Sequence, residues 1–432
     1  MLSLLGFLTI CVFLGLILTK RLSVLLSLIL VPVVFALIAG FGPKEVGEML
    51  LGGIKQVAPT GILLIFAVLY FSVMIDTGLF DPVIAFIIRF AKGDPLKITL
   101  GTAILTMLVH LDGDGTATFM ITVTALFPVY KKLGMNKLIL PCIVALSAGV
   151  MHLVPWSGTV ARALNVMNTD PAHLIIPILP AMIGGILWVL FVAFWLGKKE
   201  RKRLGVVELD YDHHQQLSVE QKESRRPRLF WLNAVLTIIL IAALILSLAP
   251  PPALFIIGFA VAILVNYPSQ ADQKKRIQAH AANVFSVSII VFAAGVFSGI
   301  LTGTKMIDAM ALSMVSMIPT AHAGYLPALV GVTSMPLSLV FTPDAYYFGV
   351  IPVLKTTAAH YGLNSIEIGR AAILGQMTTG FPLSPLTAST FVLIGLSEVE
   401  LADHQKFTFK WAFGTTIIMT LIALASGAIS IS

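Results

Sequence analysis

The chain has 432 residues, of which 57% are apolar and 11% are charged, and its mean hydropathy is +0.95. This composition excludes an ordinary soluble domain and indicates an integral membrane protein embedded in a lipid bilayer. The net charge of +7 is interpreted as a topology signal, and no nucleic-acid partner is expected. Cys11 and Cys142 each lie alone in an apolar run, so neither a disulfide nor a sulfur-ligated metal is expected.

Apolar runs long enough to cross a bilayer as helices recur along the chain. They predict spans at 2–18, 22–40, 57–79, 138–168, 174–197, 229–249, 252–267, 283–303, 365–396 and 408–430. The first run has no basic segment before it and no small-residue cleavage site after it, so we interpret it as a retained helix. Two further apolar segments, 98–130 and 323–360, are interrupted by polar, Gly or Pro residues. Each is expected to be a helical hairpin that enters the membrane and returns.

The two halves of the chain repeat each other. Phe66-Ala67 and Phe71-Ser72 reappear 226 residues later, and similar spacings relate several further pairs: Asp81 and Asp308, Asp114 and Asp344, Gly134 and Gly362, Gly149 and Gly375, Ser157 and Ser384. Duplicated hydrophobic halves are typical of secondary transporters, in which the substrate lies between the repeats.

This repeat predicts the division of the chain. The first repeat is placed at 1–197, with scaffold helices in 1–97, the hairpin and a broken helix in 98–168 and a last span at 174–197. The hydrophilic stretch 198–228 is the expected cytoplasmic linker. The second repeat, 229–432, holds a scaffold at 229–320, the hairpin at 323–360, a broken helix at 365–396 and a last span at 408–430.

The basic residues predict the orientation. With a cytoplasmic linker and ten alternating spans, 22 of the 28 Lys and Arg residues fall on the cytoplasmic side and four outside. Five spans per half place both termini outside and invert the second repeat. The expected fold is therefore an all-α polytopic membrane protein with two inverted-topology repeats. Each repeat contains a re-entrant hairpin and a broken transmembrane helix.

The first hairpin turns at Asp112-Gly113-Asp114-Gly115-Thr116. Carboxylates at membrane depth are costly unless they face water, a cation or a hydrogen-bond donor. The two glycines permit conformations that expose backbone amides, and Thr116 is expected to cap the returning helix.

The second hairpin turns at Thr342-Pro343-Asp344. A Thr at the N-cap followed by Pro at the first helical position predicts a helix start. Both tips thus aim a helix N-terminus at the bilayer midplane, which suits an anionic ligand. The alternative is that Asp114 and Asp344 only cap their helices.

Each hairpin precedes an apolar segment that Pro and Gly residues break at its centre, at 151–159 and at 378–387. Both segments are expected to unwind near mid-membrane, where freed carbonyls and hydroxyls can hold a ligand rich in oxygen. The candidate residues are Ser157, Gly158, Thr159, Thr379, Gly380, Ser384 and Thr387. Proline kinks with a purely structural role are the alternative, but two breaks at matched positions favour a binding site.

Four further residues are candidates by their chemistry. Arg162 and Arg370 lie within spans and can bind a substrate carboxylate in a bidentate manner, unless they extend to the membrane surface instead. His110, beside the first tip, and His152, in the first break, are candidate proton carriers. The alternative for both histidines is a packing role.

The stretches LTMLVHLDGDGTATFMITVTALFPVYKKLGM and SAGVMHLVPWSGTVARAL resemble the CitMHS family, the metal–citrate:proton symporters of bacteria within the ion transporter superfamily. The resemblance extends over essentially the whole chain. It implies proton-driven uptake, across the bacterial cytoplasmic membrane, of citrate complexed with Mg²⁺ or Ca²⁺. The cation is then co-transported, and no cofactor is bound permanently. It also implies a homodimer with an elevator movement.

Sodium-coupled relatives in that superfamily carry Ser-Asn-Thr at both hairpin tips. This chain has Asp-Gly-Thr at 114–116 and Thr-Pro-Asp at 342–344, and this departure weakens the case for sodium coupling. Asp112 and Asp114 are hypothesised to recognise the cation of the complex, through hard oxygen ligands, or to take up the coupling proton.

Two alternatives are open from the sequence. One is a symporter of another organic anion, such as a free dicarboxylate or a sugar acid. The other, more remote, is a polytopic membrane enzyme that uses the cluster of His110, Asp112 and Asp114, although the chain contains no HExxH or GxSxG motif.

Overall fold

The computed structural model describes residues 2–19, 21–206, 219–246, 248–315 and 320–431. All regular secondary structure in this part of the chain is helical, which confirms the predicted all-α class. Four helices are long and apolar enough to cross a membrane alone, and a fifth span results if Ser288–Gly303 and Met306–Ser313, bent by 69°, count as one. Shorter apolar helices of 10–17 residues also occur in the described part of the chain: Leu2–Phe13, Val24–Ile38, Ile139–Met151, Pro251–Asn266 and Leu326–Leu337.

The first half of the chain forms α1 (Leu2–Leu18), α2 (Val24–Ile38), α3 (Pro43–Asp76), α4 (Asp81–Ala91), α5 (Pro95–Val109), α6 (Gly115–Lys132), α7 (Ile139–Met151), α8 (Gly158–Met167), α9 (Pro171–Ile175) and α10 (Leu179–Leu204). The short α11 (Val219–Ser224) follows. The second half forms α12 (Phe230–Ile245), α13 (Pro251–Asn266), α14 (Gln270–Gly303), α15 (Met306–Val315), α16 (Thr320–Ala323), α17 (Leu326–Leu337), α18 (Ile351–His360), α19 (Ile366–Ile373), α20 (Ala388–Leu396) and α21 (Leu401–Ala425).

Helices α3 and α14 show the internal repeat most directly. Both are 34 residues long, and their first residues, Pro43 and Gln270, are as far apart in sequence as their last residues, Asp76 and Gly303. In each half a short helix, a hairpin (α5–α6 or α17–α18), a broken helix (α7–α8 or α19–α20) and a long last helix follow in that order. The two halves therefore share one sequence of elements. The domain borders at 197 and 228 stay a prediction.

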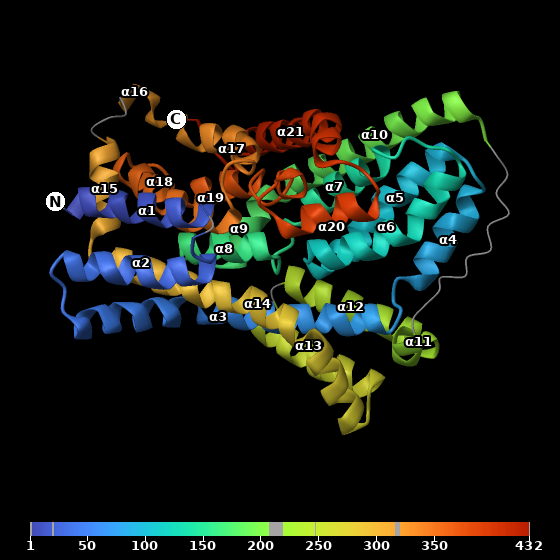
Figure 1. Cartoon of the computed structure of the whole chain (residues 1–432), viewed down its shortest axis with the longest axis horizontal. Helices are drawn as coiled ribbons and strands as arrows, with labels where there is room; N and C mark the ends of the chain where they lie inside the picture. The colour runs from blue at the N-terminus through green and yellow to red at the C-terminus, as the bar shows by residue number, and fades with distance from the viewer. Residues whose placement is uncertain (1, 20, 207–218, 247, 316–319, 432) are drawn as a thin grey trace.

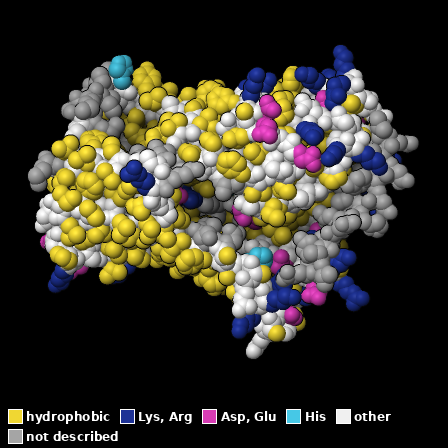
Figure 2. All heavy atoms as spheres, viewed as in Figure 1, with side chains coloured by type: hydrophobic (Ala, Val, Ile, Leu, Met, Phe, Trp, Pro, Cys, Tyr) yellow, Lys and Arg dark blue, Asp and Glu magenta, His cyan; other side chains and the backbone are white. Residues whose placement is uncertain are grey.

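The two repeats lie in opposite directions. Both chain termini lie at one end of the molecule, whereas α11 and the end of α10 lie at the other (Figure 1). The hairpin α5–α6 occupies the half of the molecule near α11, and the hairpin α17–α18 occupies the half near the termini (Figure 1). On the face shown in Figure 2, most Lys and Arg side chains gather toward the end near α10, and apolar side chains cover much of the remainder.

Helices α3 and α14 cross in direct backbone contact. A Cβ added to Gly53 would lie 2.0 Å from the carbonyl oxygen of Gly295 and 2.8 Å from the Cα of Gly299. Gly295, Gly299 and Gly303 recur every four residues and so line one face of α14. Small residues at this spacing let helices approach closely in a membrane, where van der Waals packing dominates association. This crossing joins the two repeats into one scaffold.

The helix bounds differ from the predicted spans in three places. Helices α3 and α14 begin well before the predicted 57 and 283, because their first turns are polar and lack the apolar signal of a span. Helices α4 and α15 were not predicted, because each is shorter than a membrane span. Residues 198–204 of the predicted linker continue α10, and its middle, 207–218, lies outside the described residues.

The end of the linker packs against the C-terminus of α3. The backbone N–H of Arg226 donates to the carbonyl of Thr77 over 2.9 Å, and Arg225 Nη1 donates to the carbonyl of Ile75 over 2.6 Å. A guanidinium at this position satisfies carbonyls that have no partner within the helix and complements the negative end of the helix dipole. The chain thus enters the second repeat from the end of the first scaffold.

Candidate functional site

The two hairpin tips and the two helix breaks meet around the first turn of α8. At the first tip Gly113 has φ +75°, and a Cβ there would lie 3.3 Å from the Cα of Ser157, which precedes α8. Thr159 Oγ1 donates to the carbonyl of Met377, the residue directly before the second break, over 2.8 Å. Arg162, one turn further along α8, pairs with Asp344 of the second tip. The elements that the sequence singled out therefore converge on one place between the repeats.

The first tip is a short 3₁₀ turn, His110–Asp112, followed by Gly113. Asp112 is buried, and its Oδ1 accepts the backbone N–H of Asp114 over 2.9 Å. Asp114 in turn is the N-cap of α6, and its Oδ1 accepts the backbone N–H of Thr116 over 2.9 Å. The expectation that Thr116 caps this helix is wrong. The helix begins at Gly115, because the extended backbone of Asp114 lets its carboxylate reach the free amides.

Phe381 from the second repeat lies over the first tip. Its ring is stacked on that of Phe119, with centroids 5.8 Å apart, and lies 4.7 Å from the ring of His152. A Cβ on Gly115 would lie 2.8 Å from the Phe381 ring. The close contact with the Phe381 ring thus requires a glycine at 115. Phe381, in the second break, therefore packs directly on the first hairpin tip.

His110 and His152 are hydrogen-bonded to each other. Nε2 of His110 lies 2.6 Å from Nδ1 of His152, and both side chains are buried. Nδ1 of His110 lies 2.8 Å from the hydroxyl of Thr118, which is also 3.5 Å from Asp112 Oδ1. Nε2 of His152 has no partner among the described residues. The two histidines and Asp112 thus form one polar chain that links the break to the tip.

The second tip matches the predicted helix start. Pro343 is the first helical residue, and Thr342 Oγ1 accepts the backbone N–H of Ala345 over 3.2 Å. The helix then continues as a π-helical turn, Ala345–Val350, into α18. Asp344 does not cap it, so that alternative is wrong for this residue. Its Oδ1 lies 2.6 Å from Nε of Arg162, whose Nη1 donates to the carbonyl of Gly158 over 2.9 Å.

The hydroxyls of the breaks have different partners. Ser157 is the N-cap of α8 and accepts the N–H of Val160. Its counterpart Ser384 donates to the carbonyl of Ser338, at the end of α17, over 2.6 Å. A Cβ on Gly380 would lie 2.1 Å from the hydroxyl of the same Ser338.

The threonines of the second break differ in their partners. Thr379 Oγ1 lies 2.5 Å from Thr416 Oγ1 of α21. Thr387, the N-cap of α20, has a buried hydroxyl with no partner among the described residues. The hydroxyl of Thr378 in the same break is also buried without a partner among the described residues, so two hydroxyls of this break have an unused hydrogen bond.

Arg370 lies apart from the tips. Its Nε and Nη2 donate to the carbonyl of His173, and its Nη1 donates to the carbonyl of Ala428. Arg370 therefore links α19 to His173 in α9 and to Ala428 after the end of α21. This arrangement differs from both sequence interpretations, substrate contact and extension to the membrane surface.

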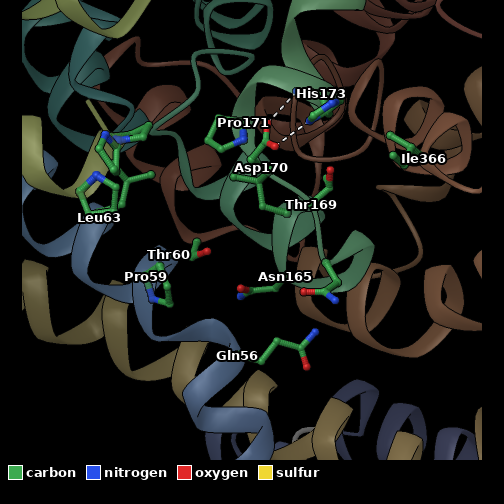
Figure 3. Close-up of a pocket in the computed structure, with 15 residues that line it drawn as sticks. Gln56, Pro59, Thr60, Leu63, Asn165, Thr169, Asp170, Pro171, His173 and Ile366 are labelled. Carbon is green, nitrogen blue, oxygen red and sulfur yellow. Dashed lines mark hydrogen bonds and ion pairs between the residues drawn. The ribbon is translucent and has the colours of Figure 1, made fainter. Parts of the chain in front are cut away.

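A cleft of about 630 Å³ separates α3 from α8 and α9. Gln56 and Thr60 of α3 line one wall, and Asn165 and Thr169 line the other (Figure 3). Asn165 is 7% exposed, and its Nδ2 has no partner in the described part of the chain. A second cavity of about 260 Å³ shares Gln56 and Asn168 and continues along α8 to Val166. Both cavities therefore lie beside the last turn of α8 and its C-cap residue, Asn168.

Asp170 and His173 lie at one edge of this cleft (Figure 3). Partial burial opposes ionisation of Asp170. The hydrogen bonds from the backbone N–H and Nδ1 of His173 outweigh that effect and hold the pKa of the carboxyl below its usual value. Asp170 is therefore a carboxylate at neutral pH.

No three His, Cys, Asp or Glu side chains within the described ranges are arranged to hold a metal ion. The carboxylates of the two tips are Asp112 and Asp114 in the first and Asp344 in the second. Asp112 and Asp114 are engaged with backbone amides of their own tip, whereas Asp344 faces a side chain of the other repeat.

Sequence reasoning missed three residues of this site. Thr118 and Phe381 complete the surroundings of the histidine pair, and Asn165 lines the cleft. Asn165 did carry a signal, since a lone amide inside an apolar helical run needs a partner. Phe381 carried none, because its role depends on how the two repeats pack.

A family model described as "Citrate transporter" (CitMHS) matches residues 10–375. Two proteins of Bacillus subtilis (strain 168) match over the full length of both chains. A "Citrate transporter" is 54% identical over 430 residues, and a "Mg(2+)/citrate complex secondary transporter" is 51% identical over 434 residues. The crystal structure of the YdaH transporter of Alcanivorax borkumensis has a TM-score of 0.62 and 13% identity, and covers 89% of each chain. That structure shows a similar fold.

Proposed function

The chain belongs to the citrate transporter family, and from this premise we propose that it imports citrate as a complex with a divalent cation, coupled to protons. It is a multi-pass membrane transporter and not an enzyme. The name of the relative that is 51% identical over the whole chain supports a Mg²⁺–citrate complex as the substrate.

The observation that carries this proposal is a positive and a negative side chain that lie in contact between the two repeats. Arg162 offers a guanidinium and Asp344 a carboxylate, 2.6 Å apart, between the two repeats. Citrate with one divalent cation carries both an anionic and a cationic region. A guanidinium fits the carboxylate in a bidentate manner, and carboxylate oxygens are suitable ligands of Mg²⁺ and Ca²⁺.

The breaks and tips supply the neutral contacts of the proposed site. The N-termini of α6 and α8 direct backbone amides toward the place where the tips meet. Ser157, Gly158 and Thr159 form its wall on the first repeat. Thr379, Gly380, Ser384 and Thr387 form the opposite wall, and the hydroxyl of Thr387, unpartnered among the described residues, is the proposed donor to citrate from the second repeat.

The coupling proton is assigned to the chain of His110, His152 and Asp112. The histidines contact each other, and Thr118 lies between His110 and Asp112, so a proton taken up at the break changes the electrostatic environment of the tip. Asp112 and Asp114 are retained as the second candidates for the cation or the proton. Sodium has no assigned role.

We also propose the elevator movement and the homodimer that the family resemblance implies. Support for the movement comes from the cleft between α3 of the scaffold and α8, which carries the site. The glycine crossing of α3 and α14 makes the scaffold rigid. The proposed orientation places the linker end in the cytoplasm and both termini outside, in the bacterial cytoplasmic membrane.

Uptake by proteoliposomes tests the function. Labelled citrate is offered with Mg²⁺, Ca²⁺, Sr²⁺ or Zn²⁺ or with EDTA, each with and without an imposed proton gradient. The expected result is uptake that requires a divalent cation and that collapses with a protonophore. Competition by unlabelled dicarboxylates and sugar acids is measured alongside. Citrate uptake that is equal in EDTA, or complete competition by a free dicarboxylate, contradicts the proposal.

A further inference from the structure

We propose that the Arg162–Asp344 ion pair is the element that makes the transporter require the metal–citrate complex. In the empty site the two side chains neutralise each other. When substrate enters, the pair opens, Arg162 binds a citrate carboxylate, and Asp344 binds the cation of the same complex. This inference rests on the proposed function and assigns its cation specificity to one pair of residues.

The pair joins the two repeats at the place where a ligand must arrive. Arg162 lies on α8 of the first repeat, and Asp344 lies at the tip of the second hairpin. Both side chains are 13% exposed, so the pair is largely desolvated but still in contact with water. Nη1 of Arg162 is held by the carbonyl of Gly158, which fixes the guanidinium at the first turn of α8.

The two cavities lie beside the face of α8 that carries Arg162. Arg162 lies three residues before Asn165, which lines the large cleft, and four before Val166, which lines the smaller cavity. Residues three and four apart share one face of a helix. Asn165, with an amide that has no partner in the described part of the chain, lines the cleft on this face (Figure 3). Arg162 therefore lies about one helical turn from the cavity lining, on the same face of α8.

The charges explain why neither component alone suffices. Free citrate satisfies Arg162 but leaves Asp344 unpaired next to added negative charge. A free cation satisfies Asp344 but leaves Arg162 unpaired next to added positive charge. An uncompensated buried charge weakens binding by about a hundredfold or more. The complex supplies a partner for each residue, so only the complex opens the pair without leaving a charge unpaired.

The test measures single-component binding to purified protein. Citrate affinity is measured with Mg²⁺ and with EDTA, and Mg²⁺ affinity is measured without citrate. For Asp344→Asn, the ratio of citrate affinities with and without Mg²⁺ is expected to fall toward one, because Arg162 is then free to accept citrate alone. For Arg162→Gln, Mg²⁺ alone is expected to bind at least tenfold more tightly than to wild type, since Asp344 has lost its competitor.

Glu398→Gln is the matched control, because it removes an ion pair with Lys131 and Lys137 whose side chains are about half exposed. Its ratio of citrate affinities with and without Mg²⁺ is expected to equal that of wild type. An Asp344→Asn protein that keeps the wild-type ratio overturns the inference while the proposed function stands. Wild-type binding that is independent of the metal overturns the proposed function itself.

If Asp344→Asn does not fold, Asp344→Glu decides the matter, since it keeps the charge and moves the carboxylate by one methylene. A carboxylate that contacts the cation changes the ratio of Mg²⁺-dependent to Ca²⁺-dependent citrate binding when it is moved. An unchanged ratio overturns the inference.

Discussion

Nε2 of His110 lies 2.6 Å from Nδ1 of His152, and the neighbours of the two rings determine where the protons sit. Thr118 donates its hydroxyl hydrogen to the carbonyl of Asp114 over 2.8 Å, so it accepts from Nδ1–H of His110. Nε2 of His110 is then the acceptor, and Nδ1 of His152 is the donor. The bare nitrogen of the neutral pair is Nε2 of His152, the atom without a partner among the described residues.

This arrangement predicts a limit of one additional proton. A proton on Nε2 of His152 preserves every hydrogen bond of the pair. A second proton, on Nε2 of His110, would place N–H against N–H. We expect His152→Gln to abolish gradient-driven accumulation of citrate and to retain exchange of labelled for unlabelled metal–citrate. The measurement compares accumulation and exchange in the same proteoliposomes.

His360→Gln is the control for the histidine prediction, because His360 is exposed at the end of α18, away from the pair. It should retain both activities. Accumulation by His152→Gln at the wild-type level contradicts the assignment of the proton to this pair.

Asp114 has a capping role that can be separated from its charge. Asp114→Ala removes the bond to Thr116 N–H and should lower the stability by about 1 kcal/mol. Asp114→Asn keeps a capping oxygen, so the unfolding temperature in detergent should change little. If the charge also contacts the cation or the proton, Asp112→Asn combined with Asp114→Asn lowers metal-dependent uptake although the protein is stable. Unchanged uptake contradicts the hypothesis for both carboxylates.

The sequence predicted those parts of the site that local chemistry determines. Gly113 and Asp114 predict a turn, and Thr342 followed by Pro343 predicts a helix start. The pairing of Arg162 with Asp344 was not predicted, because the two residues are 182 positions apart and belong to different repeats. Phe381 over Gly115 was missed for the same reason. Local signals give elements and turns, whereas contacts between the repeats depend on how the halves pack.

One long-range feature of the fold could be predicted from the sequence, namely the duplication of the two halves. The echo of Phe66 at Phe292 predicted two equivalent halves, and α3 and α14 have equal lengths as a result. The close crossing at Gly53 was not predicted, since a glycine in an apolar helix carries no information about its partner. Short helices such as α4 were missed because span length was the criterion.

The crossing of α3 and α14 offers a sharp test with neighbouring glycines. Gly53→Ala places a Cβ 2.0 Å from the carbonyl oxygen of Gly295, so the helices must separate. We expect a loss of about 1–3 kcal/mol, as for overpacked cores. Gly52→Ala meets no heavy atom within 4 Å and should be neutral or slightly stabilising, because alanine favours the helix. Thermal unfolding in detergent distinguishes the two. Equal stability of both variants contradicts the close crossing.

The cleft between α3 and α8 predicts a sided pattern of chemical labelling. In a background without Cys11 and Cys142, Thr60→Cys on the cleft wall should react with a membrane-impermeant maleimide added outside intact cells. Lys222→Cys, on the exposed α11 at the opposite end of the molecule, should react only after the cells are opened.

The substrate gives the same experiment a second readout. If α8 moves against α3 as an elevator, citrate with Mg²⁺ closes the cleft for part of the cycle and slows labelling at Thr60→Cys. Labelling at Lys222→Cys stays unchanged, because α11 does not line the cleft. Reaction of Thr60→Cys only in opened cells contradicts the proposed orientation, whereas outside labelling that substrate leaves unaffected contradicts the movement. The two conclusions are therefore tested separately by one pair of variants.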